Sequence, residues 1–326
     1  MSLLEVCNLK VRFQADRRRL RRSSGCVRAV DDVSFAIEPG ETLGLVGESG
    51  CGKTSLARAV IRLIEPASGS VWFEGEELTR LDAAALRSRR RKFQMIFQDP
   101  YTTLDPLMTA GEAIGEALDV HQLCQGEEDR RRQIEVLLSE VGLDPEHARR
   151  YPHEFSGGQR QRIGIARALA VRPKLVVCDE PVSALDVSVQ AQIINLLREL
   201  QRSLGIAYLF ITHDLAVVEH ISQRILVMYL GRVMEAGEAK LICRSPKHPY
   251  TQALLSAVPV LDPDSKRQRI ILPGEPPSPI DPPSGCPFHP RCPLAEARCR
   301  EQTPALREIG AGHQVACHLV APPPMG

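Results

Sequence analysis

The stretch Gly47-Glu48-Ser49-Gly50-Cys51-Gly52-Lys53-Thr54 decides the fold. It follows the pattern G-x-x-x-x-G-K-[ST], which is typical of a loop that binds phosphate groups. Glycine has no Cβ, so the backbone N–H groups of such a loop can turn inward onto phosphate oxygens. An apolar segment, 42–46, precedes the loop and a helical pattern, 54–64, follows it. Because the positive N-terminus of that helix would face the same anion, the sequence predicts a strand, a phosphate loop and a helix.

The residues that end the loop predict a nucleoside triphosphate with Mg²⁺. Lys53 is expected to reach the β- and γ-phosphates, and the Thr54 hydroxyl to hold the metal. Asp179 would be a second Mg²⁺ ligand, because it ends the apolar run 175–178 and ligands bind at the carboxyl ends of parallel strands. Glu180 would face the γ-phosphate and act as general base on the attacking water. Without the loop, these two acids would be ordinary solvent-facing residues.

Length and composition limit the classes of protein to which the chain can belong. Its 326 residues are enough for one large α/β domain and an extension. A net charge of +1 gives no reason to expect nucleic acid as a partner. No apolar run approaches the length of about 18 residues that a membrane span needs, and no secretory signal opens the chain. We therefore expect a protein of the reducing cytosol.

The hydrophobic pattern predicts an α/β fold with inserted and appended parts. Segments 3–13 and 27–37 are expected to be strands that precede the phosphate loop. Continuous apolar runs at 175–178 and 207–211 are typical of parallel strands buried on both faces. Helical patterns fill residues from about 99 to 160, which predicts a helical insert. Segments 224–229 and 232–236 are expected to form a hairpin, and proline-rich sequence follows residue 246.

Two capping boxes mark helix starts in this region. Thr109 is followed by Glu112, and Ser156 is followed by Gln159, each at the spacing at which the two residues satisfy each other's backbone N–H groups. The helix that begins after Ser156 would offer a second positive N-terminus, and hence a second anion site.

Several segments, in order along the chain, resemble the motifs of ATP-binding cassette (ABC) ATPases. The segment 155–162, FSGGQRQR, is similar to the family signature, although Phe155 stands where leucine is commoner. The remaining motifs are Gln98 for the Q-loop, Asp179-Glu180 for Walker B, Ser183-Ala184-Leu185-Asp186 for the D-loop, and His213 for the switch histidine. The resemblance spans about residues 1–240 and implies a P-loop (RecA-like) core with an antiparallel β subdomain and a helical subdomain.

The resemblance also implies a role for each matching residue. Gln98 would contact Mg²⁺ and the attacking water, and His213 would bond the γ-phosphate. The ATP of one subunit would meet the signature helix of the other, and Asp186 would cross between subunits. Phe13 is the candidate for stacking on adenine, with simple packing as the alternative. The implied ATP contacts are Phe13, Gly47, Glu48, Ser49, Gly50, Cys51, Gly52, Lys53, Thr54, Ser55, Ser156, Gly157, Gly158, Gln159 and Asp186.

Other segments resemble the dipeptide/oligopeptide importer branch of this family. They are 99–108, 151–155, 248–251, and the tail from 272–277 through 285–293. The expected organisation is therefore a nucleotide-binding domain at 1–240, with a helical subdomain at about 99–160, and a C-terminal extension at 241–326.

The extension carries four cysteines, Cys286, Cys292, Cys299 and Cys317, spaced C-x5-C-x6-C-x17-C. In a reducing compartment such a group suggests a metal rather than disulfides. The close C-x2-4-C pair of zinc sites is absent, and wider spacing suits an iron–sulfur cluster held by four thiolates. The resemblance implies a [4Fe-4S] cluster. Nearby histidines at 289, 313 and 318 keep Zn²⁺ open as an alternative, and a tail without metal is the third possibility.

The sequence thus predicts an ATPase subunit that powers peptide import through a membrane ABC transporter. The expected partners are a second, related ATPase subunit, two membrane permeases and a substrate-binding protein, with no nucleic acid. The expected location is the cytoplasmic face of the membrane, held there by the permeases. Nickel or glutathione is the alternative cargo. Alternatives of another class are a soluble ABC ATPase of DNA repair or translation and a redox-sensing iron–sulfur protein.

Overall fold

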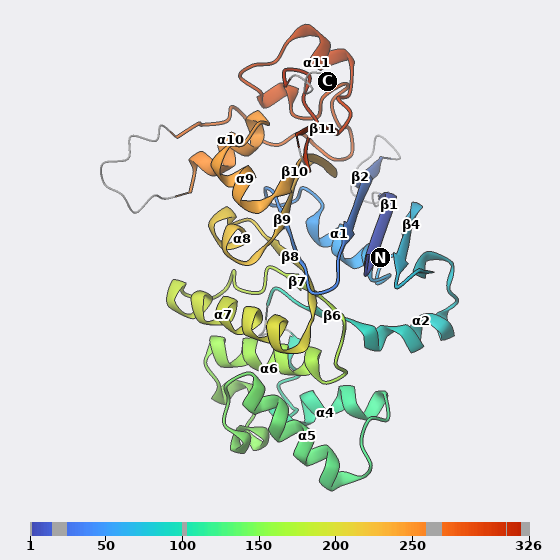
Figure 1. The fold of residues 1–326 in the computed structure, drawn as a ribbon, viewed down its shortest axis with the longest axis vertical. Coiled ribbons are helices and arrows are strands. Elements are labelled where there is room, and N and C mark those ends of the chain that lie inside the picture. Colours follow the sequence, from blue (N-terminus) through green and yellow to red (C-terminus); the bar gives the residue numbers. More distant parts are fainter. Residues whose placement is uncertain (1, 15–24, 100–102, 259–268, 311, 321–326) are drawn as a thin grey trace. The chain divides into compact units, whose positions relative to one another are not determined.

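The computed structural model describes residues 2–14, 25–99, 103–258, 269–310 and 312–320 (Figure 1). The contacts within the chain divide it into two compact units. The first unit comprises Met1–Ile37, Thr42–Thr79 and Thr212–Gly326. The second comprises Glu38–Glu41 and Arg80–Ile211. The C-terminal extension therefore belongs to the same compact unit as the phosphate loop.

One sheet of the first unit is antiparallel. Its strands are β1 (Leu4–Gln14), β2 (Cys26–Ile37), β4 (Ser68–Phe73) and β5 (Glu76–Glu77), in the order β2-β1-β4-β5. Along β1 the buried side chains include Leu4, Val6, Leu9 and Val11. Irregularities in the register fall between these positions, so that apolar residues stay on the covered face. The two strands predicted at 3–13 and 27–37 are confirmed.

The second sheet of the first unit carries the phosphate loop. Strand β3 (Thr42–Val46) is buried along its whole length and pairs in parallel with β9 (Arg224–Tyr229). The predicted hairpin is confirmed, because β9 pairs antiparallel with β10 (Arg232–Glu238). Two strands of the tail, β12 (His313–Val315) and β11 (Arg307–Gly310), continue the sheet beyond β10. The sequence pattern did not predict them.

Short helices complete the first unit. The helix after the phosphate loop is α1 (Lys53–Val60), shorter than the predicted 54–64 because Arg62 adopts a positive φ of 49°. The others are α8 (Leu215–Ile221), α9 (Ala239–Arg244), α10 (Pro249–Ser256) and α11 (Ala297–Glu301).

The second unit contains the parallel strands that the continuous apolar runs predicted. Strand β7 (Leu175–Asp179) pairs in parallel with β6 (Phe93–Ile96) on one side and with β8 (Ala207–Thr212) on the other. All five residues of β7 are buried. The α-helices whose bounds the structure describes in this unit are α2 (Ala83–Arg89), α4 (Ala110–Val120), α5 (Glu127–Glu140), α6 (Gly157–Leu169) and α7 (Val187–Leu204).

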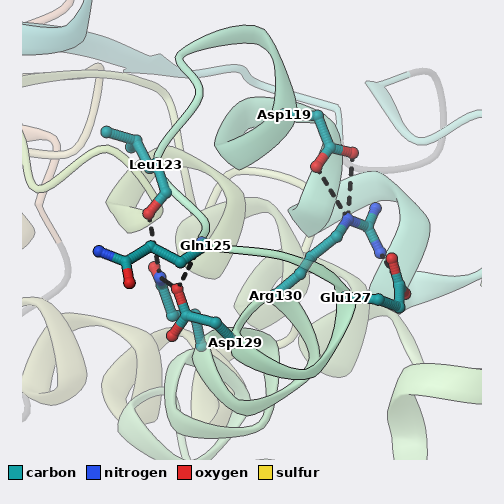
Figure 2. Close-up of polar contacts among 7 residues, drawn as sticks. Asp119, Leu123, Gln125, Glu127, Asp129 and Arg130 are labelled. Atoms are coloured by element: carbon teal, nitrogen blue, oxygen red, sulfur yellow. Dashed lines mark hydrogen bonds and ion pairs between the residues drawn. The ribbon is translucent and has the colours of Figure 1, made fainter.

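Polar contacts fix the turn between α4 and α5 in the second unit (Figure 2). Arg130 Nε donates to both carboxylate oxygens of Asp119, at 2.9 and 3.1 Å, and Arg130 Nη1 lies 3.8 Å from Glu127. The backbone N–H of Gln125 donates to Asp129 at 3.0 Å. These bonds join the end of one helix to the first turn of the next, where acidic side chains also favour the helix dipole.

Both predicted capping boxes are present. The Thr109 hydroxyl accepts from the Glu112 N–H, and the Glu112 carboxylate accepts from the Thr109 N–H at 2.7 Å. Ser156 and Gln159 exchange the same two bonds at the start of α6, at 3.3 and 3.0 Å.

Candidate nucleotide site

The phosphate loop closes around Lys53 in the first unit. Its side chain is 5% exposed, and Nζ donates to the carbonyl oxygens of Gly47, at 2.7 Å, and Glu48, at 3.0 Å. Gly52 precedes α1 with a φ of 106°, in the region that favours glycine. A Cβ there would lie 2.0 Å from the carbonyl oxygen of Ala29. Glycine at 52 is therefore required both by the backbone conformation and by the neighbouring strand.

Cys51 lies inside the loop as a buried thiol. Its Sγ is 4.0 Å from Lys53 Nζ. Burial raises the pKa of the Cys51 thiol, although the Lys53 ammonium acts in the opposite direction. The thiol is thus neutral at physiological pH, and Cys51 contributes volume to the loop rather than a charge.

The outer face of the loop is accessible. Ser49 and Gly50 are exposed, and Thr54 and Ser55, in the first turn of α1, are partly exposed. A cavity of about 370 Å³ adjoins the loop, lined by Glu48, Ser49, Gly50, Cys51, Tyr229, Leu230 and the proline-rich segment 275–279. The loop is therefore open to solvent at Ser49 and Gly50.

The acidic pair of the second unit lies at the end of β7. Asp179 is 3% exposed. Glu180 has a φ of 46°, which residues other than glycine rarely adopt. Its N–H donates to the Ile211 carbonyl at 3.0 Å. Gln98, which follows β6, donates its side-chain amide to the Glu180 carboxylate at 3.2 Å. This hydrogen bond brings Gln98 and Glu180 together across 82 residues of sequence.

The signature helix α6 presents an exposed Ser156 at its N-terminus. Phe155, the departure from the family pattern, is 4% exposed, and its ring packs edge-on against His147 with centroids 5.5 Å apart. Gly157 and Gly158 form the first turn of the helix. A Cβ at Gly158 would lie 2.5 Å from a methyl carbon of Val189 on α7, so glycine lets the two helices approach.

Three more predicted residues occupy exposed positions. Asp186 begins α7 as its N-cap, and the hydroxyl of Ser188, donating to the Asp186 carboxylate, lowers the pKa of that carboxyl. His213 follows β8 and is exposed. The ring of Phe13 on β1 is 37% exposed. Each can contact a ligand or partner without rearrangement of the core.

The four tail cysteines lie within electrostatic range of one another. Burial is the main cause that raises the pKa of Cys286 to about 11; the neighbouring Cys299, Cys317 and Cys292 act in the same direction, and a hydrogen bond from the Phe288 backbone acts against it. Three of the four thiols are buried, and all four are free. A set of four thiols has the donor chemistry of an iron–sulfur or zinc site. Nevertheless, within the described ranges no group of three or more His, Cys, Asp or Glu side chains is arranged to hold a metal ion.

Sequence reasoning missed two residues that contact the phosphate loop. The Tyr250 hydroxyl accepts from the backbone N–H of Glu48 at 2.9 Å. Arg291 forms an ion pair with the Glu48 carboxylate at 2.7 Å. Both come from the C-terminal extension, more than 200 residues further along the chain. No local pattern in the sequence could have indicated these contacts.

Comparison with known proteins gives matches over nearly the whole chain. Residues 30–183 match the family described as ABC transporter, and residues 234–299 match the family described as oligopeptide/dipeptide transporter, C-terminal region. The putative oligopeptide transport ATP-binding protein YkfD of Bacillus subtilis is 54% identical over 98% of this chain and 96% of its own length. The oligopeptide transport ATP-binding protein AppF, also of Bacillus subtilis, is 52% identical over 98% and 97%, respectively.

Solved structures show the same fold. A dimeric ATP-binding cassette, MJ0796, in a post-hydrolysis state with ADP and Pi, is 27% identical, with a TM-score of 0.63. The match covers 72% of this chain and 98% of that one. CbiO1 of Clostridium perfringens, part of the transporter complex cbiONQ, has a TM-score of 0.64 at 25% identity, covering 75% and 91%. The predicted fold class, family and transport-coupled ATPase are thereby confirmed. This chain belongs to the ABC transporter family of ATP-binding proteins, in the branch that carries the oligopeptide/dipeptide transporter C-terminal region.

Proposed function

We propose that this ABC ATPase powers the import of peptides through a membrane transporter. The observation that carries the proposal is the pairing of a complete set of cassette motifs with a tail of the oligopeptide/dipeptide transporter type. Relatives 52–54% identical over nearly the whole chain are named for peptide transport. The cassette would occupy residues 1–240, including the helical subdomain at about 99–160, and the extension residues 241–326.

The nucleotide would be ATP with Mg²⁺. Phosphates would bind the N–H groups from Gly47 to Ser55, with Lys53 turning from the loop carbonyls to the β- and γ-phosphates. Such a turn exchanges two neutral acceptors for charged ones, which favours the bound state. Thr54 and Asp179 would hold Mg²⁺, and Phe13 would stack on the adenine through its exposed ring.

Hydrolysis would use Glu180 as the general base. Its carboxylate would accept a proton from the attacking water, and Gln98, already bonded to that carboxylate at 3.2 Å, would orient the water and contact Mg²⁺. His213 would donate to the γ-phosphate, where negative charge develops. Exclusion of water from the site would strengthen each of these interactions.

Lys53→Ala tests the binding step of this proposal. Removing the ammonium takes away the cation that pairs with the β- and γ-phosphates. We expect nucleotide affinity to fall by at least about tenfold, the effect of losing one charge-assisted hydrogen bond. Equilibrium binding of a fluorescent ATP analogue measures it. Affinity equal to that of the unmodified chain would remove Lys53 from the site.

Two ATP sites would form between this chain and a second, related ATPase subunit. The segment Ser156, Gly157, Gly158 and Gln159 of one chain would contact the ATP bound to the other, with Asp186 crossing between them. The exposed N-terminus of α6 supports this assignment because its N–H groups and dipole suit an anion. So does Val187, which follows Asp186 and is 82% exposed, an apolar side chain available to a partner.

Two membrane permeases would receive the motion of the dimer, and a substrate-binding protein would deliver the cargo. The segment 98–108 would contact the permeases. Residues 100–102 lie outside the described part of the chain, but Leu107 is 84% exposed, which suits a docking surface. No helix in the described ranges combines the length and apolar character needed to cross a membrane. Binding to these permeases would hold the chain at the cytoplasmic face of the membrane.

Reconstitution tests the cargo. The chain would be combined in lipid vesicles with the permeases, the second ATPase and the binding protein from neighbouring genes. We expect ATP hydrolysis to rise when the binding protein carries a di- or oligopeptide, and to stay at the basal rate with Ni²⁺ or glutathione. If only Ni²⁺ or only glutathione stimulates ATP hydrolysis, that compound is the cargo and peptides are not. As a control, Lys53→Ala should lose the stimulation of ATP hydrolysis by peptide. That loss would show that the response needs this chain.

A [4Fe-4S] cluster would be held by Cys286, Cys292, Cys299 and Cys317, with Zn²⁺ as the alternative. The mutual proximity of the four thiols supports a shared metal. Because burial raises the pKa of Cys286 and Cys292, loading would release protons and weaken as the pH falls. Iron, sulfide and zinc analysis of protein purified without oxygen distinguishes the two metals. Protein with neither metal and with undiminished stability would contradict the assignment.

A further inference from the structure

Two residues of the C-terminal extension, Tyr250 and Arg291, contact the phosphate loop at Glu48. Arg291 Nη1 donates to Glu48 Oε2 at 2.7 Å, and Nη2 donates to Glu48 Oε1 at 3.2 Å. The arginine side chain is 8% exposed and that of Glu48 is 26% exposed. This two-point geometry is directional, because a planar guanidinium matches a carboxylate only in one plane. It therefore fixes the orientation of the Glu48 side chain.

The backbone of Glu48 is held as well. Its N–H donates to the Tyr250 hydroxyl at 2.9 Å, and its carbonyl accepts from Lys53 Nζ at 3.0 Å and from the Cys51 N–H at 3.3 Å. Glu48 thus joins two residues of the extension to the lysine that the loop encloses. A change in the position of Glu48 must alter the carbonyl that Lys53 contacts and the N–H groups that follow.

Arg291 is in turn held by the extension. It ends a short 3-10 helix, His289–Arg291, and its Nε donates to the Pro273 carbonyl at 3.3 Å. Its guanidinium lies 6.0 Å from the ring centroid of Tyr229. The rings of Tyr229 and Tyr250 are themselves in contact, with centroids 4.8 Å apart. These contacts therefore fix the position of the guanidinium. The ion pair in turn fixes the position of the Glu48 side chain in the loop.

We propose that Arg291 is a positioning residue for the phosphate loop, acting through Glu48. The ion pair holds the first turn of the loop in the conformation that receives the β- and γ-phosphates, so the extension sets the affinity for ATP. The inference rests on the proposed binding of ATP at this loop. A merely structural role for Arg291, fastening the extension to the rest of its unit, would leave the affinity of folded protein unchanged.

The test is the dissociation constant and the number of ATP sites in the full-length chain, measured by titration with a fluorescent ATP analogue. Arg291→Met keeps the volume of the side chain and removes its charge. We expect the dissociation constant to rise about tenfold, the effect of one charge-assisted hydrogen bond, with an unchanged number of sites. The dissociation constant of Arg291→Lys should lie between those of the unmodified chain and of Arg291→Met, because an ammonium cannot make the two-point contact.

Arg298→Met is the matched control. Arg298 also lies in the tail, but it is exposed and bonds only within the tail, to Glu296 and to the His318 carbonyl, among the contacts that the structure describes. The Arg298→Met variant should leave the dissociation constant for the ATP analogue unchanged. Two results for Arg291→Met would overturn the proposal. One is a smaller number of ATP sites with an unchanged dissociation constant at those that remain. The other is binding equal to that of the unmodified chain.

A second variant covers the case in which Arg291→Met does not fold. Glu48→Gln removes the charge from the other side of the pair while keeping the extension intact. It should raise the dissociation constant by a similar factor, and combining it with Arg291→Lys should add nothing further, because both changes act on one interaction. Additive effects would overturn the proposal. Unchanged binding in Lys53→Ala would instead remove the proposed ATP site itself, so the two failures are distinguishable.

Discussion

Glu180 holds a backbone conformation that costs free energy for any residue with a side chain. Its φ of 46° lies in the left-handed region, and such a residue costs about 1–3 kcal/mol. The bond from its N–H to Ile211 and the bond from Gln98 to its carboxylate stabilise this conformation. The motif Asp179-Glu180 was predicted from sequence. Its dihedral angle was not, because a positive φ follows from these distant partners and not from the residue type.

Glu180→Gln tests the role of this residue. The amide cannot accept the proton of the attacking water, whereas its size preserves the site. We expect ATP binding to be retained and turnover to fall by at least about 10²-fold, the contribution of a positioned general base. Single-turnover hydrolysis and equilibrium binding measure the two effects.

The control for that prediction is Glu199→Gln, an exposed position on α7 that should leave both quantities unchanged. Retained wild-type hydrolysis in Glu180→Gln would assign the base to another group. Because the substituted chain should hold unreacted ATP, the closed dimer is expected to accumulate and to elute earlier in gel filtration.

At the scale of the element, α6 owes its position to one glycine. Its start after Ser156 could be predicted from the capping box, because that signal is local. Its close approach to α7 could not, because the requirement for glycine at 158 comes from Val189 on another helix. Sequence patterns thus identified the helix, whereas its packing became known only from the structure.

Gly158→Ala should therefore destabilise the second unit. The added Cβ would lie 2.5 Å from the Val189 methyl, and overpacking of this kind costs about 1–3 kcal/mol. Gly164→Ala on the same helix is the matched control, because a Cβ there meets nothing within 4 Å. That change should stabilise the helix by about 0.5–1 kcal/mol. Denaturant unfolding measures both, and Val189→Ala should partly restore the stability of Gly158→Ala. Equal effects of the two glycine substitutions would contradict the packing argument.

The helix α10 depends on a buried histidine in its neutral form. His248 is 1% exposed, and its Nδ1 accepts from the Tyr250 N–H at 3.1 Å as the N-cap. Burial lowers the pKa of His248 from 6.5 to about 3. The unfolded chain therefore binds a proton at a higher pH than the folded chain. Stability contributed by this group is present above pH 6.5 and is lost as the pH falls toward 3.

His248→Asn should flatten this dependence. Asparagine is also an N-cap acceptor but does not titrate, so the slope of unfolding free energy against pH should decrease by up to about 1.4 kcal/mol per pH unit. Denaturant unfolding at a series of pH values measures the slope. His220→Asn, at an exposed position of α8, should leave it unchanged. An identical slope in His248→Asn would mean that another group carries the acid sensitivity.

At the scale of the whole molecule, the tail and the phosphate loop belong to one compact unit. The order of motifs predicted the cassette, and the cysteines and prolines marked the extension. Neither indicated that β12 would pair with β10, or that Glu235 on β10 would be fully buried. Such contacts join distant segments, and periodicity reports only the faces of single elements. The iron–sulfur cluster expected at the four cysteines stays a prediction, because the described residues contain no group of three or more side chains arranged to hold a metal ion.

His313→Ala should weaken this whole unit. His313 Nε2 lies 2.7 Å from Glu235 Oε1, with both side chains at most 4% exposed. Leaving a buried polar group without one partner costs about 1–3 kcal/mol. Thermal unfolding and hydrogen exchange should report the loss along β10 as well as in the tail. His318→Ala, in the same segment but with an exposed hydrogen bond, should change stability by no more than about 0.5 kcal/mol. Exchange that increases in the tail alone would contradict the coupling.

The ion pair between Glu48 and Arg291 also sets the order of events during synthesis. Its two partners are separated by 243 residues, so at about 5–20 residues per second the loop is made roughly 12–50 s before its arginine. Strand β12 is made later still. A nascent chain can therefore form the strand and helix around the loop early, but it cannot assemble the complete first unit until Arg291 and β12 have been made. The affinity for ATP would therefore reach its full value only after the extension has been made, and chains that stop before residue 291 would bind nucleotide about tenfold more weakly.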